Sequence, residues 1–284
     1  KYCMNKKCPV CNSQNTKILY DLNDYHVVAG IPGIVHSCVT CSMLFKTFDT
    51  DIESFYLSDE GNDEQFLFQY SESKWAMKFF EDVLRSNPFV NMNKRTRETL
   101  LDIGSGKGAL LEVALKNNYE ASGVEINKSL INQIMKKGFR IFEGKYGNLK
   151  IDERFDVITM MDVIEHVPDP QNLLKKVLAN LKPDGTLIVY TPNHASNIVT
   201  LARLFYSIGI KGPMQEIFAS NHVSFFNKKN LKKLLNSHGF SNVITKNKTY
   251  NPLRPHVRSS LISQYFMTLL DYFGLITFTN TSRF

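Results

Sequence analysis

The feature that most constrains this chain is a glycine-rich turn that follows an apolar segment. Residues 100–108 read Leu-Leu-Asp-Ile-Gly-Ser-Gly-Lys-Gly, and the next residues, from about Ala109 to Asn117, are predicted to form a helix. Because glycine has no Cβ, such a turn can bring backbone amides close to a ligand, and the first amides of the helix point the same way. Glu125 lies near the end of the next apolar segment, 122–126, where a carboxylate can accept hydrogen bonds from ribose hydroxyls. The pattern predicts a nucleotide-binding strand, turn and helix.

The region that follows continues the alternation of strands and helices. Residues 155–167 read as another strand and its exit, and 186–190 read as a further strand after the turn Lys182-Pro-Asp-Gly185. Between them, Asp169 and Pro170 are typical of an N-cap and a first-turn proline. The predicted helix has one apolar face, formed by Leu173, Leu174, Val177, Leu178 and Leu181. Such alternation predicts an α/β fold whose parallel sheet is covered on both faces.

Residues 98–193, about a third of the chain, resemble the S-adenosylmethionine (SAM) binding core of class I methyltransferases. The resemblance is carried by four motifs: L-D-I-G-S-G-K-G, G-V-E-I, F-D-V-I-T-M-M-D-V-I-E-H-V and L-K-P-D-G-T-L-I-V. It implies a Rossmann-like seven-stranded methyltransferase sheet with SAM as the cofactor. A dinucleotide-binding dehydrogenase is the main alternative, but its G-x-G-x-x-G fingerprint differs from the glycine positions here, 104, 106 and 108. An inactive protein that keeps the fold is the remaining alternative.

The same resemblance implies which residues hold the cofactor: Asp102, Gly104, Gly106, Glu125, Asn127, Met161 and Asp162. Asp102 and the two glycines are expected at the methionine end of SAM, and Glu125 at the ribose. Asn127 would flank the adenine, and the last two members of the set would end the fourth strand beside the cofactor. Many members of the family bind the adenine amino group through an acid after the third strand. Lys145 stands at that place here, which is a departure from the family pattern.

All five cysteines lie within the first 41 residues. Four of them form two C-x2-C pairs, Cys8-Pro-Val-Cys11 and Cys38-Val-Thr-Cys41, with 26 residues between the pairs. Two such pairs are typical of a tetrahedral structural zinc site, in which each pair supplies two thiolates from one tight turn. Disulfides are the less favoured alternative, because a cytosolic methyltransferase is in a reducing compartment. Cys3 is left over, and we expect a free thiol there rather than a competing ligand.

Three histidines are candidates for a general base, although a single histidine is more often structural than catalytic. His222 begins the segment His-Val-Ser-Phe-Phe, which resembles the H-V-x-x-F element of sugar C-methyltransferases. In those enzymes a histidine serves as the base, and they too begin with a four-cysteine zinc ribbon; Asn221 here replaces their neighbouring Glu. His166 belongs to a Glu-His-Val element that recurs in the wider family, and His194 follows the fifth strand. We expect His222 and His166 as the catalytic residues, with His194 less favoured.

Composition narrows the choice of chemistry without naming the substrate. The net charge is +7, and the lysines and arginines are scattered in short clusters rather than in an arginine-rich run. Such clusters can attract a phosphorylated or nucleotide-linked substrate, but they do not favour nucleic acid. The predicted catalytic core has no cysteine, which excludes methyl transfer through a covalent cysteine adduct. No signal peptide is predicted, and the longest apolar region, 261–278, is too polar to span a bilayer, so we expect a cytoplasmic protein.

The patterns divide the chain into a zinc ribbon over 1–48, a linker and helical cap over 49–97, and a SAM-binding domain over 98–284 with a substrate-capping segment around 194–230. An amphipathic helix is predicted within 71–87, and Tyr56 or Tyr70 could face the cofactor or substrate. The end of the chain is predicted to form a strand over 243–250, a helix over 261–273 and a strand over 275–284. The two strands suit an antiparallel hairpin that closes the sheet.

These features predict SAM-dependent methyl transfer to a small molecule or glycan precursor. A saccharide or nucleotide-linked sugar is the favoured acceptor, with an oxygen nucleophile slightly ahead of carbon. One alternative is a ribosomal RNA base methyltransferase whose zinc module joins a continuous basic face. Another is a binding protein in which the SAM fold is not catalytic. The sequence does not indicate the oligomeric state.

Overall fold

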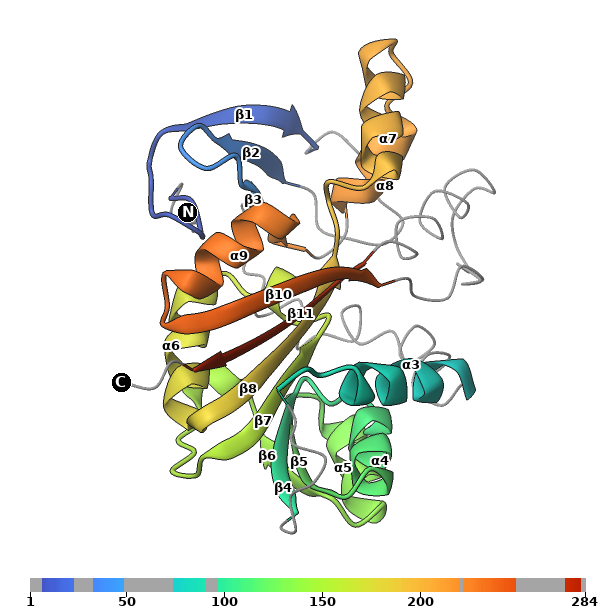
Figure 1. Cartoon of the computed structure of the whole chain (residues 1–284). Coiled ribbons are helices and arrows are strands. Elements are labelled where there is room, and N and C mark those ends of the chain that lie inside the picture. Colours follow the sequence, from blue (N-terminus) through green and yellow to red (C-terminus); the bar gives the residue numbers. More distant parts are fainter. Residues whose placement is uncertain are drawn as a thin grey trace.

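The computed structural model describes residues 7–22, 33–48, 74–89, 97–219, 222–248 and 274–281 (Figure 1). The strands of the larger sheet are β4 (Glu98–Ile103), β5 (Tyr119–Glu125), β6 (Arg140–Glu143), β7 (Phe155–Met161), β8 (Leu181–Pro192), β10 (Phe240–Lys248) and β11 (Gly274–Thr281). Those of a smaller sheet are β1 (Thr16–Asp21), β2 (Ile34–Cys38), β3 (Leu44–Thr47) and β9 (Ser224–Phe225). The helices are α3 (Lys74–Arg85), α4 (Ala109–Lys116), α5 (Lys128–Lys136), α6 (Pro170–Asn180), α7 (Asn197–Ser207), α8 (Gly212–Ala219) and α9 (Lys228–Asn236), with short 3-10 turns η1 (Tyr146–Asn148) and η2 (Ile164–His166).

The larger sheet has seven strands in the order β10-β11-β8-β7-β4-β5-β6. Neighbouring strands from β6 to β8 pair in parallel, and β11 lies antiparallel between β8 and β10. The predicted seven-stranded Rossmann-like sheet and the antiparallel hairpin at its edge are both confirmed. From β4 the chain proceeds to β5 and β6 on one side, and then to β7 and β8 on the other. This reversal places the topological switch point, where open α/β sheets bind ligands, at the carboxyl ends of β4 and β7.

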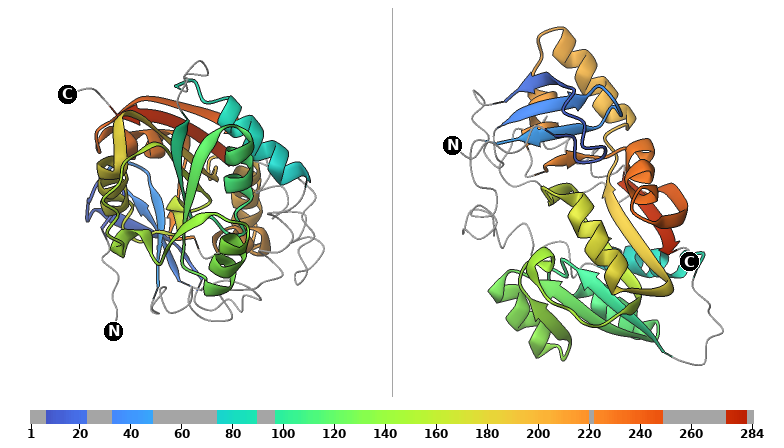
Figure 2. Two further views of the ribbon diagram at one scale, coloured as in Figure 1. Left: turned by 90° about the horizontal axis from the view of Figure 1, so that it is seen from below. Right: turned by 90° about the vertical axis from the view of Figure 1, so that its left-hand side faces the viewer.

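Side chains that alternate along the central strands divide the core into two layers. Leu100 packs in a cluster with apolar residues of α3 and α4, and Leu101 packs in a second cluster with residues of α6 and α9. Both leucines are fully buried, which stabilises the fold by about 1.5–3 kcal/mol for each side chain. The sheet is therefore covered on both faces, as its near-continuous apolar strands predict (Figures 1 and 2).

The smaller sheet joins the cysteine-rich segment to a distant part of the chain. Its order is β1-β2-β3-β9, so three strands come from the first 48 residues and the fourth from the segment after α8. Leu44 pairs with Phe225, and Phe45 pairs with Ser224, in antiparallel register. The cysteine pattern predicts a ribbon that ends at residue 48, and no pattern in the sequence indicates this fourth strand.

Helices α7 and α8 pack against one face of strands β2 and β3, whereas Phe45 of β3 packs with residues of α9 on the other face. Val35 and Leu44 share a hydrophobic cluster with Ala202 of α7 and with Ile217 and Phe218 of α8. Figure 2 shows the three blue strands beside these orange helices in both views. The predicted capping segment around 194–230 thus contacts the cysteine-rich segment as well as the end of the large sheet.

Some predicted features lie outside the described residues, including Cys3, Tyr56, Tyr70, Asn221 and the helix over 261–273. The helix predicted within 71–87 corresponds to α3, and the strand predicted to begin at 243 begins at Phe240, before an irregularity between Ser241 and Ile244. Within the part of the chain that the structure describes, no helix is both long and apolar enough to cross a membrane.

Candidate functional site

The glycine turn lies at the carboxyl end of β4. Gly104 and Gly106 have φ angles of 76° and 54°, in the left-handed region that favours glycine. A Cβ on Gly104 would come within 2.7 Å of Cγ2 of Val163, which follows β7, whereas a Cβ on Gly106 would meet no atom within 4 Å. The turn therefore packs against the exit of β7 at Gly104 and has open space beside Gly106.

Glu125, at the carboxyl end of β5, is held against this turn by backbone amides. Its Oε2 accepts a hydrogen bond of 2.8 Å from the amide of Gly106. Its Oε1 accepts hydrogen bonds from the amides of Ile126 and Asn127, at 2.8 and 3.0 Å. Burial raises the pKa of Glu125, while these three amides act in the opposite direction. A carboxylate has about four acceptor positions, so one remains for a ligand hydroxyl.

Asp102 lies below the turn, near the end of β4, and is 3% exposed. Its Oδ1 accepts a hydrogen bond of 2.6 Å from the Thr159 hydroxyl on the neighbouring strand. Burial raises the pKa of Asp102 to about 7, and the charge of Glu125 acts in the same direction. Asp102 is therefore buried in the sheet before the turn, and only Glu125 contacts the turn at Gly106. A cationic ligand bound nearby would favour the ionised forms of both acids.

The remaining predicted cofactor residues lie at the same edge of the sheet. Asn127 is the N-cap of α5, and its side chain accepts hydrogen bonds from the amides of Ser129 and Leu130. Met161 ends β7, and Asp162 follows it with a φ of 53°, which is uncommon for a residue other than glycine. The Asp162 amide donates to the Tyr190 carbonyl of β8. Strained positions of this kind often cluster at ligand sites.

Two of the predicted histidines meet beyond the exit of β7. The rings of His166, in η2, and His222, in the capping segment, have centroids 4.7 Å apart in an edge-to-face arrangement. Glu165 lies beside them, and ligand atoms of these three side chains are all within 4.8 Å of one another. A carboxylate and two imidazoles at this spacing can share a proton or bind a divalent cation.

Glu165 itself is buried, with 1% of its surface exposed. Its Oε2 accepts a hydrogen bond of 3.0 Å from the Thr191 hydroxyl of β8. Burial, together with the charge of nearby Asp162, raises its pKa well above the ordinary range. In the sequence, Glu165 is noticed only as part of the Glu-His-Val element, although an acid within an otherwise apolar run is a signal that could have identified it.

His194 has a different environment from the other two histidines. It is buried against the rings of Phe218 and Phe225, and neither ring nitrogen has a hydrogen-bond partner within the described residues. Burial lowers the pKa of His194 to about 3, and the charge of Arg203 acts in the same direction. A base with so low a pKa accepts a proton poorly at neutral pH, so His194 is a poor candidate for the general base.

The four cysteines of the two C-x2-C pairs form a separate cluster. Their Sγ atoms all lie within 4.8 Å of one another, and none of the four residues forms a disulfide. The Sγ atoms of Cys8 and Cys41 are 3.5 Å apart, and those of Cys11 and Cys38 are 3.6 Å apart. Zinc bound by four sulfurs at about 2.3 Å requires sulfurs separated by about 3.8 Å, so the cluster has the dimensions of such a site.

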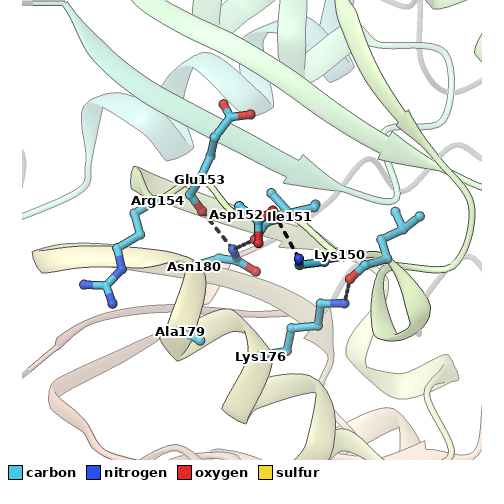
Figure 3. Close-up of a pocket in the computed structure, with 9 residues that line it drawn as sticks. Lys150, Ile151, Asp152, Glu153, Arg154, Lys176, Ala179 and Asn180 are labelled. Carbon is cyan, nitrogen blue, oxygen red and sulfur yellow. Dashed lines mark hydrogen bonds and ion pairs between the residues drawn. The ribbon is translucent and has the colours of Figure 1, made fainter.

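A surface pocket lies away from both clusters, at the amino end of β7 (Figure 3). Asn180 of α6 donates to the carbonyls of Ile151 and Glu153, and Lys176 donates to the Leu149 carbonyl. These bonds fasten the loop before β7 to α6. The pocket is at the opposite end of the parallel strands from the glycine turn. The polar side chains of Asn180 and Lys176 that line it already bond the loop, so their presence needs no ligand.

Known proteins resemble this chain in sequence. Residues 77–245 match the methyltransferase domain family. The ubiquinone biosynthesis O-methyltransferase of Coxiella burnetii is 36% identical over 104 residues, which cover 33% of this chain and 43% of that protein. The protein of the same name from Stutzerimonas stutzeri is 25% identical over 171 residues, which cover 57% of this chain and 72% of that protein. The chain thus spans less than half the length of the first of these relatives.

Solved structures resemble the fold as well. A SAM-dependent methyltransferase of Thermotoga maritima has a TM-score of 0.53 at 20% identity, covering 81% of this chain and 99% of that one. The plantazolicin methyltransferase BpumL, in complex with SAH, has a TM-score of 0.55 at 16% identity, covering 82% of this chain and 94% of that one. At these identities the similarity shows the fold. The family match covers more than half of the residues, and this chain belongs to the methyltransferase domain family.

Proposed function

We propose that this protein is a SAM-dependent methyltransferase of a small-molecule acceptor. The observation that carries the proposal is the hydrogen bond between Glu125 and the Gly106 amide at the switch point of the sheet, next to the open space beside Gly106. The family match and the SAH-bound structural neighbour support SAM as the cofactor. In this proposal Asp102, Gly104 and Gly106 hold the methionine end, and Glu125 accepts from the ribose hydroxyls.

The chemistry places few demands on the protein. Bound SAM supplies a methyl group on a sulfonium, which is already a good leaving group. The chain's own residues must therefore align the acceptor and, for a hydroxyl acceptor, remove its proton. His222 and His166 are the proposed proton acceptors, because they extend from two different elements toward one another at the carboxyl edge. The ionised form of Asp102 or Glu125 would stabilise the cationic cofactor.

We propose an oxygen nucleophile for the acceptor. The relatives from Coxiella burnetii and Stutzerimonas stutzeri carry O-methyltransferase names, which supports oxygen over carbon. A saccharide or nucleotide-linked sugar remains our proposed acceptor class, and its support is the His-Val-Ser-Phe-Phe segment together with the cysteine pairs. The names of these relatives refer to ubiquinone biosynthesis and give no support to the sugar.

We also propose that Cys8, Cys11, Cys38 and Cys41 bind one structural zinc ion. The spacing of their sulfurs fits a four-thiolate site, and such a site has no open position for catalysis. Elemental analysis of the purified protein should give about one zinc per chain. Replacement of Cys11 and Cys38 by serine should remove it. Protein that is fully folded and free of metal would contradict this assignment.

The proposed activity is tested first by calorimetry with SAH and then by transfer of a radiolabelled methyl group from SAM. The acceptor panel should include catechols, nucleotide-linked sugars and a ribosomal RNA fragment. Micromolar SAH binding with transfer to a small molecule supports the proposal. Transfer to RNA alone would favour the RNA methyltransferase, and no SAH binding would favour the non-catalytic alternative.

A further inference from the structure

Lys46, in strand β3 of the ribbon, forms hydrogen bonds with residues on both sides of His222, namely Phe218 and Val223. The side chain of Lys46 is 1% exposed, and its Nζ donates a hydrogen bond of 2.7 Å to the Phe218 carbonyl in the last turn of α8. Its backbone amide donates a hydrogen bond of 2.8 Å to the Val223 carbonyl, directly after His222. The two bonds extend the pairing of β3 with β9 by one residue and connect β3 to α8.

The same segment is connected on its other side to the large sheet. The Val223 amide donates to the Glu165 carbonyl at 2.8 Å, in η2 next to His166. Val223 therefore bridges Lys46 of the ribbon and Glu165 of the β7 exit through its own backbone groups. His222 lies immediately before this bridge, and its ring meets the ring of His166.

Lys46 is a buried lysine, and packing alone would favour an apolar side chain at such a position. Burial lowers the pKa of Lys46 to about 7, so the fold bears a cost for keeping an ammonium group there. A cation is stabilised by the carbonyls at the C-terminal end of a helix, and by the Phe48 ring, whose centroid lies 4.8 Å from Nζ. An apolar side chain of the same length would fill the space without the desolvation cost, but it would leave the Phe218 carbonyl without this donor.

We propose that Lys46 is a positioning residue for methyl transfer, through which the cysteine ribbon sets the place of His222 against His166. The ribbon is then one wall of the catalytic site rather than a separate binding module. Metal bound by the cysteines would act on the reaction through β3, without contact with the reacting atoms. The effect of Lys46 on methyl transfer rests on the proposed function, whereas its effect on the position of His222 does not.

The test compares Lys46→Met with Lys17→Met, a change of an exposed lysine on the outer ribbon strand β1. Hydrogen–deuterium exchange of the full chain should be about tenfold faster in the peptide that contains Phe218 and Val223 for Lys46→Met only. The NMR signals of the His222 and His166 rings should shift, whereas those of His238, at the end of α9, should not. Zinc content should stay the same, because Lys46 is not one of the four cysteines. The melting temperature should change little, because the relief of burying an ammonium offsets the loss of the hydrogen bond to the Phe218 carbonyl.

A second measurement removes the metal from the unaltered chain with a chelator. Faster exchange should then spread from the cysteine pairs to Val223 but not to β4 and β5, and SAH affinity should change less than twofold. Unchanged exchange at Val223 in both experiments, or faster exchange with unmoved His222 signals, would overturn the proposal. If the unaltered chain with its metal in place does not bind SAH, the proposed function is overturned instead, and the exchange result still stands.

Discussion

The two halves of the candidate site are built in different ways. In the cofactor half, the hydrogen bond between Gly106 and Glu125 joins residues 19 positions apart, within one strand–helix–strand unit. In the histidine half, the bond between Lys46 and the Phe218 carbonyl joins residues 172 positions apart. The cofactor half can therefore be recognised in a short motif, whereas the histidine half exists only after three distant segments have packed together.

This difference predicts that the halves can be broken separately. Changes in the histidine half should reduce turnover and leave cofactor affinity intact. Changes in the cofactor half should weaken binding and leave the positions of the histidines intact.

The largest expected effect is on turnover. His222→Ala should lower the methyl transfer rate by about 10²–10⁴-fold, the usual cost of losing a general base, while SAH affinity stays within twofold. The measurement is single-turnover transfer once an acceptor is known, with His238→Ala as the control. Equal loss of SAH binding in His222→Ala would mean that the two halves are not separable.

A smaller effect is expected on the cofactor. Glu125→Ala should weaken SAH binding by about 1.5–3 kcal/mol, the scale of a hydrogen bond to a charged group. Glu143→Ala is the matched control, because Glu143 pairs with Glu125 across β5 and β6 but does not bond the glycine turn. Calorimetry that gives the same affinity for both variants would remove Glu125 from the proposed ribose contact.

A third effect separates His194 from the other histidines by pH. The pKa of His194 is lowered to about 3 in the folded state, against about 6.5 when unfolded. Between these values the unfolded chain takes up a proton that the folded one does not, so stability falls as pH falls below 6.5. At pH 5 this costs about 2 kcal/mol. His194→Phe should remove that part of the acid sensitivity in denaturant titrations and retain turnover; loss of turnover at pH 7.5 would show a catalytic role.

The smallest effect concerns Asn127. Asn127→Ala should lower the free energy of unfolding by about 1 kcal/mol, because it removes the cap of α5. Asn127→Asp retains the cap and should be as stable as the parent. If both variants bind SAH as tightly as the parent, the predicted contact of Asn127 with adenine is wrong.

The parallel part of the large sheet can be predicted from the sequence because its signals are local, whereas the number of seven strands is implied by the resemblance to class I methyltransferases. Each signal spans only a short stretch of sequence. Examples are the apolar strand before Gly104, the helix cap at Asp169 and the apolar helix face that begins at Leu173. The bounds of β6 could not be predicted in this way, since its four residues are too few to show a period and none is fully buried.

The histidine half could be predicted only in part. The motif around His222 identifies the residue, but its meeting with His166 depends on the fold. Nothing near Lys46 in the sequence indicates α8, because a lysine after an apolar pair is typical of any strand edge. Strand β9, with two residues, is also too short to recognise without its partner β3.

The late origin of β9 has a consequence for biosynthesis. The cysteine pairs leave the ribosome well before the strand that completes their sheet, which is synthesised about 180 residues later, since Phe45 pairs with Ser224. Pairing over such a sequence separation is slow, because the loop between the partners must close first. We therefore expect the nascent cysteine-rich segment to have an exposed edge at β3 until β9 is synthesised. Chaperones would protect that edge, and early binding of metal by the cysteines would stabilise the segment meanwhile.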